Sequence, residues 1–133
     1  MPLTIKEGGF TEYYRPALSW TKRFFKGNLD SIIACNELNY LAYKLEHGEP
    51  DILMVQAGYP GALIGKYLSE KYQIPYHVHI RLGGFMFERL LKDLGGQHAE
   101  FLSGINDANL ISVTSEFQAE GLKRWVPEAN LMS

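Results

Sequence analysis

The chain has 133 residues, the length of one domain, and 46% of them are apolar, 13% aromatic and 21% charged. This composition supports a packed core and excludes an intrinsically disordered chain. The formal net charge of −2 excludes attraction of nucleic acid by the chain as a whole, and the single cysteine, Cys35, excludes an internal disulfide. No apolar run reaches the length of about 18 residues that spans a membrane, and residues 1–10 lack the apolar core of a signal peptide. We therefore expect a soluble, cytoplasmic α/β domain.

Residues 1–28 are predicted to form an irregular N-terminal segment with one short helix. The glycines Gly8 and Gly9 interrupt any early element. The stretch 17–26 follows a proline, precedes a glycine and carries a rough apolar stripe, which predicts a helix. Aromatic and basic side chains alternate around it, as they do in segments that lie on an anionic membrane surface or on single-stranded nucleic acid. We interpret it as an ordinary amphipathic helix and expect no nucleic-acid partner.

Residues 29–133 are predicted to form a Rossmann-like α/β domain. A helix is predicted from Asp30, because Ala34, Leu38, Leu41 and Leu45 repeat at the spacing of one helical face. We expect these four side chains to face the core. A glycine followed by a proline at 48–50 predicts the end of this helix.

Three short apolar segments are predicted to be parallel strands, centred near Leu53, Val78 and Ile111. Helical segments separate them at 62–72, 85–94 and 98–107, and a last helix begins at a Ser115 cap with Gln118 as its capping-box partner. Strands alternating with helices imply right-handed crossovers and helices on both faces of the sheet, a three-layer α/β/α arrangement. Residues 128–133 have the composition of the beginning of another strand, so we expect a piece of a larger fold.

The loops that follow the predicted strands hold the candidate binding residues. Ligands of open parallel sheets bind beyond the carboxyl ends of the strands. Glycines occur there at Gly58, Gly61, Gly83 and Gly84, where they serve either close approach of a ligand or tight turns. Arg81 follows the second strand, where it either clamps a phosphate or carboxylate or forms a surface ion pair. Neither a G-x-G-x-x-G pattern after the first strand nor a Walker sequence is present.

Two histidines, His77 and His79, are two residues apart on the second predicted strand, so they project from the same face. Such a pair on a strand can bind zinc or iron, but the sequence supplies no motif with further ligands. We interpret the pair as packed and hydrogen-bonded and predict no metal site. A metal-dependent hydrolase using these two residues remains an alternative.

Four segments resemble, in the same order, motifs of the family 4-type glycosyltransferases, the retaining enzymes of the GT-B fold. Segment 49–62 resembles the family's strand after a Pro-Asp pair with its glycine-containing turn, and 72–79 resembles the strand that begins after an Ile-Pro pair. Segment 107–117 is similar to the element that ends in Ser-Glu, and 126–131 is similar to the approach to the interdomain hinge. The resemblance covers residues 38–132.

This resemblance implies an acceptor-side domain that takes part in transfer of a sugar from a nucleotide-sugar donor to a carbohydrate or lipid-linked acceptor hydroxyl, with retention at the anomeric carbon. It implies no metal or other cofactor. The expected location is cytoplasmic, and peripheral contact at the inner face of the membrane is kept as an alternative. The domain that holds most of the donor is missing, so the isolated chain is expected to be inactive. The resemblance assigns no catalytic residue. The alternative is a flavodoxin-like binding or signalling module without catalysis. The resemblance places these residues around donor sugar and acceptor: Gly58, Tyr59, Gly61, Arg81, Gly83, Gly84, Thr114, Ser115 and Glu116.

Overall fold

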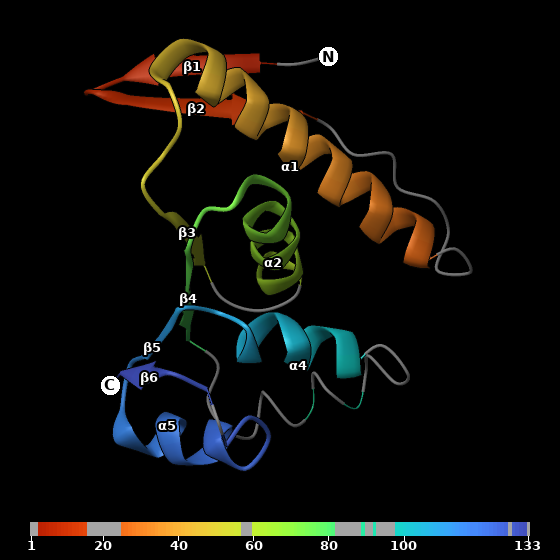
Figure 1. Ribbon diagram of the computed structural model, residues 1–133, viewed down its shortest axis with the longest axis vertical. Coiled ribbons are helices and arrows are strands. Elements are labelled where there is room, and N and C mark those ends of the chain that lie inside the picture. Colours follow the sequence, from red (N-terminus) through yellow and green to blue (C-terminus); the bar gives the residue numbers. More distant parts are fainter. Residues whose placement is uncertain are drawn as a thin grey trace. The chain divides into compact units, whose positions relative to one another are not determined.

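The computed structural model describes residues 3–15, 25–56, 60–81, 89, 92, 98–127 and 129–132 (Figure 1). The chain divides into two compact units, Met1–Pro50 and Asp51–Ser133, and each is described by itself. The helices predicted over 17–26 and 85–94 lie almost wholly outside the described residues. Within the described part of the chain, no helix combines the length and the apolar character needed to cross a membrane.

The first unit begins with an antiparallel hairpin of β1 (Leu3–Glu7) and β2 (Phe10–Tyr14). Its two-residue turn consists of Gly8 and Gly9, whose φ angles are 57° and 84°. Positive φ at both central residues is the requirement of the tight hairpin turn that matches the twist of the strands, and glycine meets it without strain. The hairpin replaces the irregular structure expected over these residues, because the two glycines connect strands instead of interrupting an element.

Helix α1 (Phe25–His47) follows in the same unit and packs against β2. The side-chain amide of Asn39 donates to the carbonyl of Tyr13 at 3.1 Å, and the rings of Tyr13 and Tyr43 meet edge to face with centroids 6.5 Å apart. The helix ends as predicted, since Gly48 has a φ of 83° and its N–H donates to the carbonyl of Lys44 at 2.9 Å.

The apolar stripe predicted to face the core from α1 lies on the exposed side of this helix. The exposed fractions are 47% for Leu38, 39% for Leu41 and 91% for Leu45, and Ala34 is exposed as well. The helical periodicity is therefore correct but its burial is not. The hairpin is contacted by the more polar side of the helix, which carries Asn39 and Tyr43.

The second unit contains a parallel sheet of β3 (Leu53–Gln56), β4 (Tyr76–Ile80), β5 (Leu110–Val113) and β6 (Leu131–Met132) in that spatial order. In register, Val55 pairs with Val78, Val78 with Ile111, and Ile111 with Leu131. The three predicted parallel strands are confirmed, and so is the further strand expected near the end of the chain. The architecture of this unit is therefore α/β.

The helices of this unit are α2 (Gly61–Tyr72), α4 (His98–Asn106) and α5 (Glu116–Lys123). Right-handed crossovers place successive helices on the same face when strands are added in one direction, and the buried residues of all three helices join one core with the sheet. Its buried members are Ala62, Tyr76, Val78, Ile80, Phe101, Ile105, Ala108, Ile111, Val113, Ala119, Leu122 and Val126.

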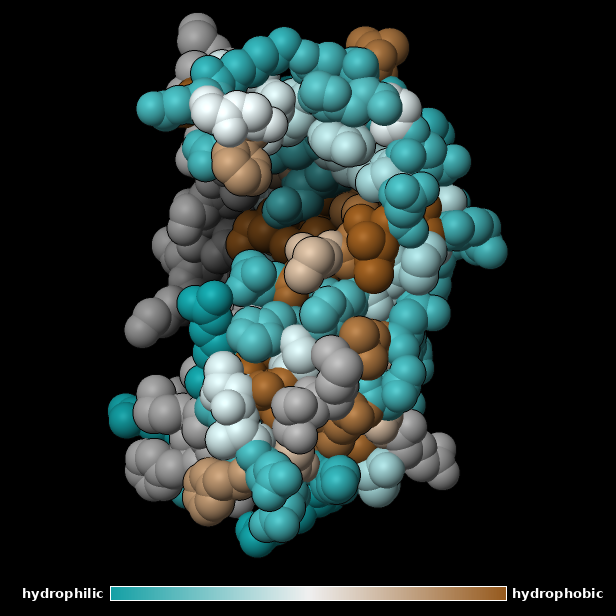
Figure 2. All heavy atoms as spheres, turned by 90° about the vertical axis from the view of Figure 1, so that its left-hand side faces the viewer, coloured by the Kyte–Doolittle hydropathy of each residue, from teal (hydrophilic) through white to brown (hydrophobic). Residues whose placement is uncertain are grey.

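The opposite face of the sheet is formed by the alternate strand positions, which we call the second face. Its described members are Met54, Gln56, His77, His79, Leu110 and Ser112. They are half-buried or exposed. The described helices of this unit pack on the other face of the sheet, which carries the buried core residues. Figure 2 views the molecule from the left-hand side of Figure 1. On the surface seen there, hydrophobic residues (brown) lie next to hydrophilic residues (teal). Of the predicted three layers, the described residues of this unit form the sheet and one helical layer.

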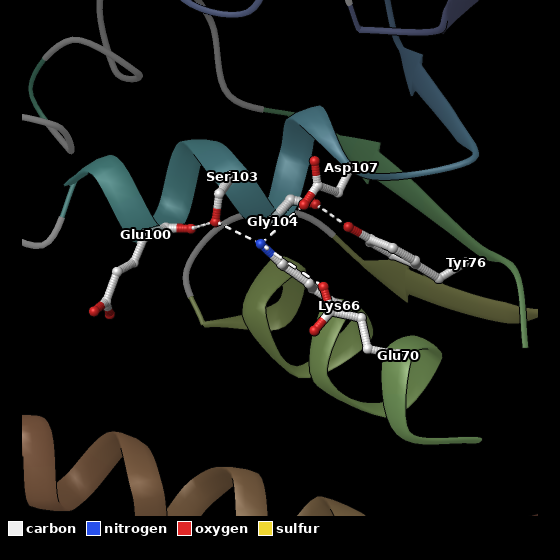
Figure 3. Close-up of polar contacts among 7 residues, drawn as sticks. All are labelled: Lys66, Glu70, Tyr76, Glu100, Ser103, Gly104 and Asp107. Atoms are coloured by element: carbon white, nitrogen blue, oxygen red, sulfur yellow. Dashed lines mark hydrogen bonds and ion pairs between the residues drawn. The ribbon is translucent and has the colours of Figure 1, made fainter. Parts of the chain in front are cut away.

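A polar network joins α2 to α4 (Figure 3). The Lys66 ammonium lies 2.8 Å from a carboxylate oxygen of Asp107 and donates to the Ser103 hydroxyl at 3.1 Å. The Ser103 hydroxyl donates in turn to the carbonyl of Glu100 at 2.7 Å. Beside this network, the hydroxyl of Tyr76 donates to the carbonyl of Gly104. Tyr76 begins β4 and Asp107 precedes β5, so these contacts lie toward the amino ends of the strands. They stabilise the packing of α2 against α4.

Candidate functional site

The candidate site is the carboxyl edge of the parallel sheet. The strands β3, β4 and β5 run in the same direction and are in register, so the segments after Gln56, Ile80 and Val113 leave the sheet at one edge. Of the site residues inferred from the sequence, Gly61, Arg81, Thr114, Ser115 and Glu116 are among the described residues. The other four lie outside them: Gly58, Tyr59, Gly83 and Gly84.

Gly61 is the first residue of α2 and lies against the end of β3. A Cβ built on it would stand 2.8 Å from Cγ1 of Val55 and 3.0 Å from the carbonyl oxygen of Gln56. Real Cβ atoms essentially never approach other atoms as closely as the first of these distances. The absence of a side chain is therefore required by the packing of helix on strand, which explains this glycine without a ligand.

Gln118 of α5 connects two of the strand ends at this edge. Its Nε2 donates to the carbonyl oxygen of Arg81 at 3.1 Å, and its Oε1 accepts from the backbone N–H of Thr114 at 2.9 Å. The hydroxyl of Thr114 also donates to this Oε1. One side chain therefore holds the residue after β4 beside the residue after β5. The sequence predicted only a capping role for Gln118, and nothing local in the sequence indicates its long-range bond to Arg81.

Ser115 caps α5, as predicted. Its φ of −158° and ψ of 160° are extended, and its Oγ accepts from the backbone N–H of Gln118 at 3.3 Å. In a capping box, the side chain of Gln118 would accept from the backbone N–H of Ser115. In the structure its Oε1 accepts from the backbone N–H of Thr114 instead, so the predicted capping box is only half formed. Glu116 is exposed in the first turn, where its negative charge complements the helix dipole.

Arg81 is exposed directly after β4. Its backbone position is determined by the bond from Gln118 to its carbonyl. A guanidinium at this edge can bind a phosphate or carboxylate with two parallel hydrogen bonds. Among its described residues, the edge thus combines the permanent positive charge of Arg81 with the hydroxyls of Thr114 and Ser115, a set suited to an anionic, hydroxyl-bearing ligand.

The strand histidines occupy the second face of the sheet, as their spacing predicts. His77 Nε2 and His79 Nδ1 each lie 2.7 Å from the hydroxyl oxygen of Ser112, on the neighbouring strand β5. Both imidazoles are half-buried. The prediction of a hydrogen-bonded pair is confirmed, and the partner is a residue that sequence spacing does not indicate.

Among the residues that the structure describes, no group of three or more histidine, cysteine, aspartate or glutamate side chains is arranged to hold a metal ion. Cys35 of α1 is half-buried. Comparisons with protein-family models, with curated proteins and with solved structures found no match to this chain.

Proposed function

We propose that this chain is the acceptor-side part of a retaining, GT-B-type glycosyltransferase that transfers a sugar from a nucleotide-sugar donor to a carbohydrate or lipid-linked hydroxyl. The observation that carries this proposal is the joining of Arg81 and Thr114 by Gln118 at the carboxyl edge of a parallel sheet. Open parallel sheets bind their ligands at this edge. The resemblance of the segments around β3, β4 and β5 to family 4-type enzymes supplies the reaction class.

In this proposal Arg81 binds the donor phosphate or an anionic acceptor through charge-assisted hydrogen bonds, which typically contribute about 1.5–3 kcal/mol each. The hydroxyls of Thr114 and Ser115 orient sugar hydroxyls, and Glu116 belongs to the same edge. Catalysis by this set consists of positioning and of electrostatic stabilisation, with no metal and no other cofactor. The donor is held mainly by a second domain, and the chemistry takes place between the two domains.

The experiment uses the protein encoded together with the sequence that flanks this chain. It is incubated with UDP-, GDP- and ADP-sugars and with glycan and lipid-linked acceptors, and the anomeric configuration of each product is determined by NMR. We expect transfer with retention from one donor class, and no turnover by the 133-residue chain alone. Failure to transfer from every donor, inversion of configuration, or turnover by the short chain would overturn the proposal.

The variant Arg81→Ala tests the role of the carboxyl edge in the same assay. We expect kcat/KM to fall about 10- to 100-fold, since each 1.36 kcal/mol corresponds to about a tenfold change in rate. Arg81→Lys should recover only part of this loss, because lysine lacks the bidentate fork. The matched control is Arg124→Ala, which removes an exposed arginine at the far end of α5. Equal kinetics for Arg81→Ala and the control would refute a binding role for Arg81.

A further inference from the structure

The carboxamide of Gln118 lies where β4 and β5 stop pairing. The last pair in register on these strands is Ile80 with Val113, and each strand is followed by a residue that bonds Gln118. The carbonyl of Arg81 accepts from Nε2 at 3.1 Å, and the N–H of Thr114 donates to Oε1 at 2.9 Å. A carboxamide offers the same donor and acceptor as a peptide group. The side chain of Gln118 therefore acts as one peptide unit inserted between the two strands at the carboxyl edge.

The position of this carboxamide is also fixed from the side of α5. The backbone N–H of Gln118 donates to the Ser115 hydroxyl at 3.3 Å, and the next residue, Ala119, is buried in the core with an exposed fraction of 8%. The hydroxyl of Thr114 gives Oε1 a second donor. A side chain bonded at its backbone and at its polar end has little freedom left to lose when a ligand binds. Helix α5 thus preorganises the edge by holding both strand ends.

The bridge between the strand ends requires a neutral amide. An amide combines an N–H donor and a carbonyl acceptor in one planar group, whereas a carboxylate only accepts and an ammonium only donates. A carboxylate at position 118 would keep the bonds from Thr114. It would face the carbonyl oxygen of Arg81 with no proton between the two acceptors. The acceptor and the donor of Gln118 therefore serve different strands, and a single-atom change in the side chain separates them.

Resting on the proposed function, in which Arg81 binds an anionic group, we propose that Gln118 is the positioning residue for Arg81. Its bond to the carbonyl of Arg81 fixes the backbone from which the exposed guanidinium extends. An arginine on a fixed backbone loses less freedom on binding than one on a free chain segment. Gln118 thereby raises the affinity of the carboxyl edge for a ligand that carries phosphate, and it does so through Arg81 without touching the ligand.

The test measures the affinity of the full chain for inorganic pyrophosphate by NMR, from the shifts of the Arg81 Nε–H and the Thr114 N–H. Gln118→Met is neutral and similar in length but removes both bonds, so it should weaken binding about tenfold at every pH. Gln118→Glu loses only the donor and should weaken binding at neutral pH. The matched control is Gln73→Met, which changes an exposed glutamine after α2 and should leave the affinity unchanged.

The pH dependence of Gln118→Glu separates positioning from a merely structural role. As the pH falls through about 4, the introduced carboxyl group gains a proton, which it can donate to the carbonyl of Arg81. The ratio of the variant's affinity to that of the wild type, measured at the same pH, should then rise toward one. The same loss in neutral Gln118→Met shows that added negative charge is not its cause.

Equal pyrophosphate affinity for Gln118→Met and the wild type, with weaker binding by Arg81→Ala, would overturn the positioning role and leave the anion site in place. A loss in Gln118→Glu that persists at low pH, or no binding by the wild type, would also overturn it. Gln118→Glu keeps the test decisive if Gln118→Met fails to fold, because it retains the acceptor for Thr114. A whole protein that transfers no sugar, while pyrophosphate binding still depends on Gln118, would refute the transferase and support the positioning role.

Discussion

Gly104 of α4 lies against the backbone of Ala62 in α2, so that a Cβ on Gly104 would stand 3.0 Å from both the carbonyl carbon and the carbonyl oxygen of Ala62. The contact is with main-chain atoms, which cannot rotate away as the end of a long side chain can. The missing side chain at Gly104 thus sets how closely the two helices approach. Their polar network, with Lys66 bound to Asp107 and Ser103, is built at this spacing.

Gly104→Ala is therefore expected to destabilise the second unit. Alanine favours a helix over glycine by about 1 kcal/mol, but forcing a methyl group into a filled helix contact costs about 1–3 kcal/mol. We expect a net loss of about 1 kcal/mol in the free energy of unfolding, measured by urea denaturation of the chain. Ala62→Gly should not rescue the variant, because the atoms met are backbone. A more stable Gly104→Ala protein would show that the helices separate freely.

Tyr76→Phe removes the buried hydroxyl that donates to the carbonyl of Gly104. Burial raises the pKa of this phenol, and the nearby carboxylates of Asp107 and Glu70 raise it further, so the hydroxyl stays a proton donor throughout the neutral range. The carbonyl would lose this donor, and we expect a loss of about 1–2 kcal/mol in the free energy of unfolding. Tyr67→Phe is the control, since Tyr67 is 37% exposed and its change should stay within about 0.5 kcal/mol. Equal midpoints for the two variants would contradict the prediction.

The hairpin turn provides a test in the first unit. Gly8→Ala and Gly9→Ala place a Cβ at positive φ, at a cost of about 1–2 kcal/mol for each residue. Faster amide hydrogen exchange across β1 and β2 should report this loss. Gly8→Asn should keep most of the protection, because asparagine tolerates this conformation. Unchanged exchange in both alanine variants would mean that the turn does not limit opening of the hairpin.

Acidification should loosen the attachment of α1 to the hairpin. Hydrogen bonds from Lys6 and Tyr13 hold the pKa of Glu46 below its ordinary value of 4.5. A carboxylate with a lowered pKa in the folded state stabilises that state above its unfolded pKa, and this contribution disappears as the pH falls through the folded pKa. We expect an NMR titration of the Glu46 side chain to have its midpoint below 4.5 and Lys6→Ala to raise it. An unshifted midpoint in the wild type would show that these contacts do not persist in solution.

The sheet of the second unit could be predicted from the sequence because its signals are local. The strands around Leu53, Val78 and Ile111 are short apolar runs between breakers, and alternation of strands with helices leaves few topologies. The burial of β3 differs from what helices on both faces of the sheet would produce, because Met54 is 64% exposed. An apolar run shows that a strand is present, whereas its neighbours decide which of its faces is covered.

The contacts that define the candidate sites depend on distant residues, so the sequence did not reveal them. Gln118 reaches the carbonyl of Arg81, and Ser112 joins His77 to His79. Each requires the register of β4 against β5, which no local pattern determines. In α1 the periodicity of Leu38 and Leu41 was clear, but periodicity identifies a face and does not say what covers it.

The order of strands in the second unit has a consequence for how the chain acquires its structure. Each of β3, β4 and β5 pairs with the strand that comes next in the chain, so every pairing closes only the connection between consecutive strands. The entropy lost on closing a loop rises with its length, and sheets assembled from nearby segments form faster than those that join distant ones. Domains of this size generally fold as units. Because no pairing in the described sheet joins strands that are not consecutive in the chain, we expect the second unit to assemble quickly and as a whole.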